Sequence, residues 1–188
     1  MKTCNIVAAS DFYGELEINE NDLVIAVDAG YRHLEKLNIK PDIIIGDFDS
    51  AQKPDFEYTV CYSPIKDDTD TMLAIKYGLE KGYNFFKIYG GLGGERTDHT
   101  VANFQALGYI AQNNGRGVLV GNNEQFTVIK NSKITINSGQ GYFSVFAFGG
   151  EAHGVCISGA FYELDNANLS PFFPLGVSNC YDGNEVTI

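Results

Sequence analysis

The amino-acid sequence predicts an α/β fold: a three-layer, Rossmann-like N-terminal domain with a mostly parallel sheet, then an all-β sandwich domain. Strand and helix patterns alternate along the first ~115 residues, which is typical of a parallel sheet covered by helices. Beyond that point only short strand patterns remain, separated by turn residues. We therefore expect an α/β catalytic domain at residues 1–115 and a β-sandwich domain at residues 116–188.

Apolar runs of strand length and helical spacing define the elements of the N-terminal domain. The expected strands are residues 3–9, 23–27, 43–45, 58–62 and 85–89. The expected helices are residues 31–37, 70–81 and 98–113. Asn38 suits the end of the first helix, and Pro41 prevents its continuation.

The C-terminal part contains strand candidates without a helical pattern between them. They are residues 118–120, 126–129, 134–136, 142–148, 155–158 and 186–188. We expect its phenylalanines to form a core rather than a stacking platform, because aromatic side chains prefer burial. This set is Phe143, Phe146, Phe148, Phe161, Phe172 and Phe173. Tyr181 is the alternative candidate for stacking on a ligand.

Composition excludes several classes of protein. A hydrophobic content of 44% with 13% aromatic residues predicts a packed core rather than a disordered chain. The formal net charge of −11 disfavours nucleic acid as a partner, since phosphate-backbone binding requires a basic surface. Scattered cysteines, no visible signal peptide and no apolar run of membrane-spanning length predict a cytoplasmic protein without membrane association.

Acidic and glycine-rich groups recur where predicted strands end or helices begin. Asp47 and Asp49 follow the apolar run 43–45, and alternate residues of an extended chain project to the same side. Asp28 ends the preceding strand. Residues 66–70 and the loop 90–99, which includes four glycines, Arg96, Asp98 and His99, each open a helix. Because the carboxyl ends of parallel strands share one edge, these groups should converge on one crevice.

Each group also has a purely structural interpretation. Asp67, Asp68 and Asp70 could be favoured at a helix N-terminus by capping and by the helix dipole. Asp98 could likewise be an N-cap, and His99 could be an ordinary helix histidine. The glycines could simply permit a tight turn. Together, however, carboxylates suit Mg²⁺, glycine-loop amides suit phosphate, and Arg96 can grip phosphate oxygens through two hydrogen bonds. The combination indicates phosphoryl-type transfer.

These motifs resemble, in the same order along the chain, those of the thiamine pyrophosphokinase (thiamine diphosphokinase) family. The matching segments are residues 46–50, 67–70, 90–99, Asn103, 162–164, 168–169 and 176–179. The resemblance implies transfer of pyrophosphate from ATP to the thiamine hydroxyl with release of AMP. It also implies a β-sandwich thiamine-binding domain and a homodimer whose active sites lie between subunits.

The resemblance also assigns roles to individual residues. Asp47, Asp49 and Asp70 would hold Mg²⁺ and the triphosphate, and with Arg96 and Asp98 they form the expected catalytic set. The residues assigned to the ATP side are Asp28, Lys66, Thr69, Arg96, Asp98 and His99; those assigned to the thiamine side are Ser178 and Asn179. Asp28 matches the acid of an Asp-Gly-Gly motif in which Ala29 replaces the first glycine.

Two other functions remain as alternatives at this point. A Mg²⁺-dependent phosphatase could use Asp47 and Asp49 through a covalent aspartyl-phosphate, but this leaves the loop with Arg96 and Asp98 unexplained. A non-catalytic thiamine- or nucleotide-binding protein would not need the complete set of acids.

Overall fold

The structure, a computed structural model, describes residues 2–47, 56, 58–61 and 67–188. Its internal contacts divide the chain into two compact units, Met1–Val128 and Ile129–Ile188. The first unit contains the candidate catalytic residues that precede residue 100, and the second contains Ser178 and Asn179.

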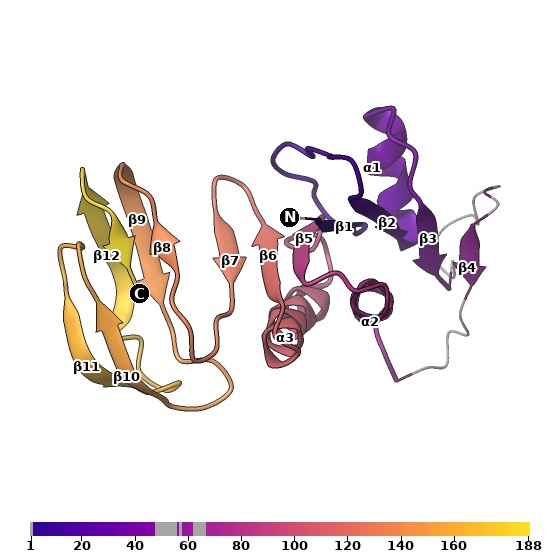
Figure 1. Ribbon diagram of the computed structural model, residues 1–188. Coiled ribbons are helices and arrows are strands. Elements are labelled where there is room, and N and C mark those ends of the chain that lie inside the picture. Colours follow the sequence, from indigo (N-terminus) through magenta and orange to yellow (C-terminus); the bar gives the residue numbers. More distant parts are fainter. Residues whose placement is uncertain (1, 48–55, 57, 62–66) are drawn as a thin grey trace. The chain divides into compact units, whose positions relative to one another are not determined.

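A seven-stranded sheet forms the centre of the first unit, in the order β4-β3-β2-β1-β5-β6-β7 (Figure 1). The strands are β1 (Cys4–Val7), β2 (Leu23–Val27), β3 (Ile43–Gly46), β4 (Thr59–Cys61), β5 (Phe85–Tyr89), β6 (Arg116–Val120) and β7 (Gln125–Thr127). Neighbouring strands pair in parallel except β7, which is antiparallel to β6. The predicted, mostly parallel sheet is therefore confirmed.

Helices cover both faces of this sheet and make three layers. The helices are α1 (Tyr31–Lys36), α2 (Asp70–Glu80) and α3 (Thr97–Gln112), and a 3₁₀ turn η1 (Asp28–Gly30) precedes α1. Buried residues of α2 and α3, such as Ile75 and Leu107, pack with Ile6 on one face. Leu34 of α1 packs with Val7 on the other face. Within the described ranges, no helix is long and apolar enough to span a membrane.

The sheet of the first unit extends beyond residue 115. β6 pairs with β5, in a register that places Phe86 opposite Gly117, and β7 pairs with β6. Both strands therefore pack with the α/β layers, and the boundary between compact units follows Val128. The division of catalytic and thiamine-binding roles at 115/116 stays a prediction.

The second unit consists of three two-stranded antiparallel sheets within the described chain. The pairs are β9 (Gln140–Val145) with β12 (Gly176–Asp182), β10 (Ala152–Ile157) with β11 (Leu164–Leu169), and β8 (Thr135–Ile136) with β13 (Val186–Thr187). The all-β prediction is confirmed. β11 and β12 were not predicted, because their sequences, LDNANL and GVSNCYD, contain few β-branched or aromatic residues.

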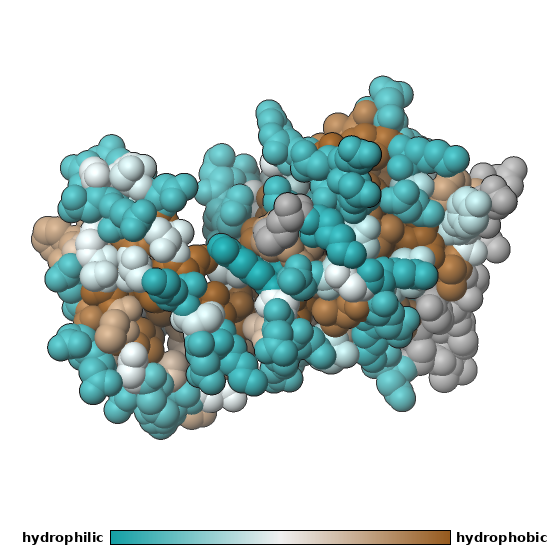
Figure 2. Space-filling view, viewed as in Figure 1, coloured by the Kyte–Doolittle hydropathy of each residue, from teal (hydrophilic) through white to brown (hydrophobic). Residues whose placement is uncertain are grey.

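The prediction that the phenylalanines of the second unit form a core is wrong for five of the six. Phe143 is half-buried, but Phe172 is 94% exposed, and the other exposed members are Phe146, Phe148, Phe161 and Phe173. Figure 2 shows apolar residues reaching the surface of this unit. The described strands of this unit leave these rings uncovered, so they remain on the surface.

Candidate active site

Three aspartates from different elements converge at the carboxyl edge of the sheet. Asp28 follows β2, Asp47 follows β3, and Asp70 is the first residue of α2. One carboxylate oxygen of each lies within 4.8 Å of those of the other two, and all three residues are half-buried. The predicted approach of Asp28, Asp47 and Asp70 is therefore seen, whereas Asp49 and Lys66 lie outside the described residues. This donor set could hold a divalent cation.

Backbone geometry at the ends of β2 and β3 brings the first two carboxylates together. Asp28 adopts a left-handed conformation with φ 49°, which aspartate tolerates better than most residues. Gly46 lies against it: a Cβ at position 46 would overlap Oδ1 of Asp28 and lie 3.2 Å from its Cα. Gly30 is equally restricted, since a Cβ there would overlap the carbonyl oxygen of Val7. Glycine at position 46 therefore leaves the space that the Asp28 carboxylate occupies.

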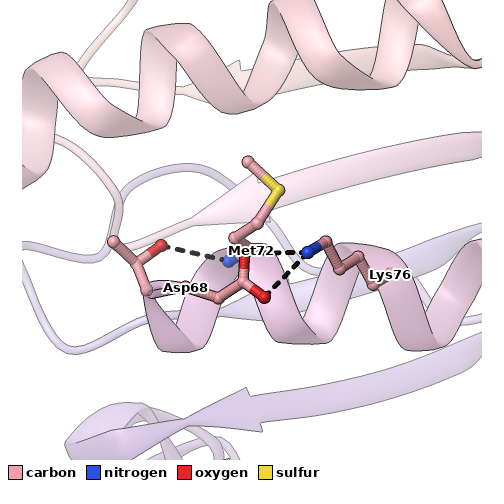
Figure 3. Close-up of polar contacts among 4 residues, drawn as sticks. Asp68, Met72 and Lys76 are labelled. Atoms are coloured by element: carbon pink, nitrogen blue, oxygen red, sulfur yellow. Dashed lines mark hydrogen bonds and ion pairs between the residues drawn. The ribbon is translucent and has the colours of Figure 1, made fainter. Parts of the chain in front are cut away.

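The residues before α2 fix the start of the helix that carries Asp70. Thr69 is the N-cap, and its Oγ1 accepts a hydrogen bond of 3.2 Å from the backbone N–H of Met72. Lys76 Nζ donates to both carboxylate oxygens of Asp68, at 2.8 and 2.7 Å (Figure 3). That hydrogen bond raises the pKa of Lys76. The N-cap is therefore Thr69 and not one of the neighbouring acids, while Asp70, one residue later, joins the acidic cluster.

The glycine-rich loop after β5 is held from both sides. Asn103 of α3 is buried, and its Nδ2 donates a hydrogen bond of 2.8 Å to the carbonyl oxygen of Gly91. Gly90, with φ 63°, lies so close to β1 that a Cβ would overlap the carbonyl oxygen of Ala8. Asn103 therefore positions the loop, a role that its place in the sequence motif does not reveal.

The loop after β1 packs against the same glycine-rich loop. Ser10 Oγ donates a hydrogen bond of 3.4 Å to the carbonyl oxygen of Gly93. A side chain at position 94 would be crowded, because its Cβ would lie 2.8 Å from the same Ser10 Oγ. Gly93 and Gly94 have φ of 75° and 73°, so both need the freedom of glycine. His33 contacts Ser10 from α1, with its Nε2 2.9 Å from the Ser10 carbonyl oxygen. The loops that follow β1 and β5 thus form one continuous rim at the carboxyl edge of the sheet.

Arg96 and Asp98 form an ion pair at the start of α3. Arg96 Nη2 donates to Asp98 Oδ2 at 2.7 Å, and the two side chains are 68% and 65% exposed. The hydrogen bond from Arg96 lowers the pKa of Asp98, and the nearby charge of Arg96 acts in the same direction. His99 follows on the exposed first turn. The pair presents an accessible guanidinium beside a helix N-terminus, where a phosphate would be favoured.

Ser178 and Asn179 have different environments in the second unit. Ser178 is exposed, has φ 57°, and donates its backbone N–H to Ser144 Oγ at 3.0 Å. Asn179 is buried, and its side chain accepts from the N–H of Tyr162 at 3.0 Å and donates to the Tyr162 carbonyl at 2.7 Å. Asn179 therefore supports the Tyr162 segment, and Ser178 presents its hydroxyl on the surface.

Comparison with known families matches nearly the whole chain. The model described as thiamin pyrophosphokinase, catalytic domain, matches residues 15–119, and the model of the thiamin pyrophosphokinase vitamin B1 binding domain matches residues 131–188. The chain belongs to the thiamin pyrophosphokinase family. Both predicted halves of the family resemblance are therefore confirmed.

Individual thiamin pyrophosphokinases agree with this assignment. The thiamine pyrophosphokinase of Bacillus subtilis strain 168 is 29% identical over 194 residues, which cover 95% of this chain and 89% of that protein. A crystal structure of the Bacillus subtilis enzyme matches with a TM-score of 0.89 at 28% identity, over 99% of this chain and 92% of that one. The Geobacillus thermodenitrificans structure shares the fold, with a TM-score of 0.79 at 21% identity over 98% and 95%.

The close approach at Gly46 predicts that Gly46→Ala weakens cation binding. The added methyl group would displace the Asp28 carboxylate, so we expect Mg²⁺ affinity to fall by about 10–100-fold, as when other supporting contacts of metal sites are lost. Isothermal titration with Mg²⁺ measures this effect. Gly150→Ala is the matched control, because a Cβ at position 150 would meet nothing within 4 Å. Equal affinities in the two variants would contradict the assigned cluster.

The Arg96–Asp98 contact predicts a measurable pH effect. The lowered pKa of Asp98 means that the ion pair is complete at neutral pH and is lost as pH falls through that pKa. Arg96→Ala should raise the pKa of Asp98 toward the ordinary value for aspartate, measured by carboxyl ¹³C NMR titration. Arg116→Ala, at the exposed start of β6, provides the control. An unchanged pKa in Arg96→Ala would exclude Arg96 as its cause.

Proposed function

We propose that this chain transfers the pyrophosphate group of ATP to the hydroxyl of thiamine, giving thiamine diphosphate and AMP. The observation that carries the proposal is the convergence of Asp28, Asp47 and Asp70 in a chain that matches both family models. A cluster of carboxylates beside a glycine-rich loop is suited to a charged polyphosphate bound through a cation.

Mg²⁺ is the proposed metal, held by Asp47 and Asp70, with Asp49 as the third ligand implied by the family resemblance. Asp28 belongs to the same cluster, and its carboxylate fits the space beside Gly46. Hard carboxylate oxygens match this ion, which also binds phosphate oxygens and water. When bound, Mg²⁺ neutralises charge on the phosphate oxygens and orients them.

The proposed reaction is an in-line displacement at the β-phosphorus of ATP. The thiamine hydroxyl oxygen forms a bond to that phosphorus, and the bond from the phosphorus to the oxygen shared with the α-phosphate breaks. AMP departs with this oxygen, and the hydroxyl proton passes to a base. A carboxylate of the acidic cluster is the proposed acceptor of that proton, since a loose transition state makes little demand on its basicity.

Arg96 is the proposed partner for charge that develops on the transferred group. Its guanidinium already forms an ion pair with Asp98 at 2.7 Å, so Asp98 holds it in place without burying it. We assign Lys66, Thr69 and His99 to the ATP side, together with Arg96 and Asp98. The hydroxyl of Thr69 also caps α2, so its contribution includes holding Asp70 at the helix start.

The second unit is proposed to bind thiamine, with Ser178 facing the acceptor. The left-handed backbone of Ser178 lies where the β9–β12 pairing shifts register, between Gly176 and Asn179. An irregularity of this kind can re-aim a side chain relative to the regular ladder. We also propose that Asn179 does not contact thiamine directly and that it supports the thiamine site through its hydrogen bonds to the Tyr162 backbone.

The exposed aromatic side chains of the second unit support a homodimer. Phe146 and Phe148 follow β9, and Phe172 and Phe173 precede β12, so they flank the paired ends at Val145 and Gly176. Large exposed apolar groups of this kind mark protein–protein contacts more often than free surface. We propose that two copies bury them against each other and that the active sites lie at this subunit interface.

Removal of one carboxylate tests the catalytic assignment. Asp47→Asn should lower the rate of thiamine diphosphate formation by about 10²–10³-fold, as expected when one preorganised electrostatic group is lost. Chromatography of AMP and thiamine diphosphate at saturating ATP, Mg²⁺ and thiamine provides the measurement. Asp47 is preferred to Asp70, whose charge in the first turn of α2 also stabilises the helix.

The control for this variant is Glu80→Gln, which removes a charge at the far end of α2. It should retain the wild-type rate, and both variants should retain the wild-type circular dichroism spectrum. Near-normal AMP release by Asp47→Asn would refute the metal assignment. Inorganic phosphate as the only product of the wild-type chain would refute the transferase assignment.

The dimer proposal predicts that a charge on the aromatic surface dissociates the subunits. Phe172→Glu should shift the mass measured by light scattering from that of two chains toward that of one, because a buried charge is costly. Lys130→Glu, on the exposed loop before β8, controls for added negative charge. A wild-type chain that remains monomeric at micromolar concentration would exclude the proposed interface.

A further inference from the structure

A cavity of about 390 Å³, open to solvent and lined mostly by exposed residues, lies at the carboxyl end of β6, away from the acidic cluster. It is lined by Gly14 and by residues 120–125, which form the end of β6 and the turn into β7. The backbone N–H of Gly121 donates to the carbonyl oxygen of Glu124 at 2.9 Å and closes this turn. Its position at the end of a parallel strand is where open α/β sheets bind their ligands.

The cavity adjoins the glycine-rich loop through Gly121. A Cβ at position 121 would lie 2.8 Å from Cδ1 of Leu92, in the glycine-rich loop, and 2.9 Å from Cγ of Glu124. The side chains of Leu92 and Glu124 therefore meet over Gly121. The loop proposed to hold phosphate and the cavity at β6 are thus neighbouring parts of one rim.

The chemistry of the lining suits an uncharged, hydrogen-bonding group rather than a phosphate. Its described members include the carboxylate of Glu124 and the amides of Asn122, Asn123 and Gln125, and none of them is basic. A carboxylate repels phosphate, whereas carboxylate and amide groups together offer acceptors and donors to the edge of a nucleobase.

The position of the cavity relative to the acidic cluster matches the length of the donor. Between β2, which ends just before Asp28, and β6 there are three strand-to-strand steps, or about 14 Å at ~4.8 Å per step. From β3, which ends before Asp47, there are four steps, or about 19 Å. An extended nucleoside triphosphate can span this interval, with its phosphates at the aspartates and its base at β6.

We propose that the turn between β6 and β7 is the nucleobase subsite of the phosphate donor and that Glu124 selects adenine. This inference rests on the proposed function and specifies the donor that the same site accepts. The Glu124 carboxylate only accepts hydrogen bonds, so it favours the exocyclic amino group of adenine over the carbonyl oxygen that guanine has at that position. Asn122 and Gln125 are available to complete the edge contacts.

The test compares ATP with purine riboside triphosphate, an analogue with hydrogen in place of the adenine amino group. The wild-type chain should favour ATP in kcat/KM by about tenfold or more, as for one hydrogen bond to a charged group. Glu124→Ala should reduce this ratio to about one, with the loss in KM for ATP and not in KM for thiamine. Glu124→Gln, which keeps an acceptor oxygen, should restore part of the ratio.

Glu20→Ala, in the exposed segment before β2, is the matched control and should keep the wild-type ratio. A wild-type ratio near one, or an unchanged ratio in Glu124→Ala, would overturn the subsite while leaving the proposed function intact. If no donor yields thiamine diphosphate, the proposed function fails. In that case, calorimetry measures the Kd of each nucleotide for the wild type and for Glu124→Ala. A preference for ATP in Kd that Glu124→Ala loses would support the subsite, and a preference that it keeps would overturn it.

Discussion

Electrostatic repulsion among three carboxylates is the constraint around which the first unit is organised. Oxygens of Asp28, Asp47 and Asp70 lie within 4.8 Å of one another, where like charges raise each other's free energy unless a cation lies near them. The register that pairs Val27 with Ile45 forces the ends of β2 and β3 side by side, so the backbone imposes this approach. Packing of the sheet against α2 maintains the arrangement, and a bound cation would stabilise the folded chain through its preference for that state.

The features predicted from sequence are those that local patterns determine. Runs such as Ile43–Gly46, buried throughout, have few alternatives to a central parallel strand, and the helices begin and end within about one residue of their predicted limits. The approach of Asp28, Asp47 and Asp70 followed from one rule, because the carboxyl ends of parallel strands share an edge. The family resemblance was equally accessible, since its motifs are short and continuous.

The features that sequence did not predict depend on contacts between distant segments. The hydrogen bond from Ser10 to Gly93 joins residues 83 positions apart, and no local pattern indicates it. Neighbouring residues can also differ in role: Ser178 is exposed in a left-handed conformation, while Asn179 is buried and bonded to Tyr162. The exposed phenylalanines were assigned to a core because hydrophobicity predicts burial without specifying whether the covering layer belongs to the same chain.

Strand order explains how one site can hold a long substrate. β1, the first strand, lies in the middle of the sheet, so the chain adds β2 and β3 on one side and β5 and β6 on the other. The acidic cluster therefore forms on one side of β1, and the glycine-rich loop and the cavity at β6 form on the other. The Ser10 loop, which follows β1 and contacts Gly93, lies between them. The acidic cluster needs only two adjacent strand ends and the start of α2, but the triphosphate and nucleoside proposed for this site would need a longer edge, which the central position of β1 offers.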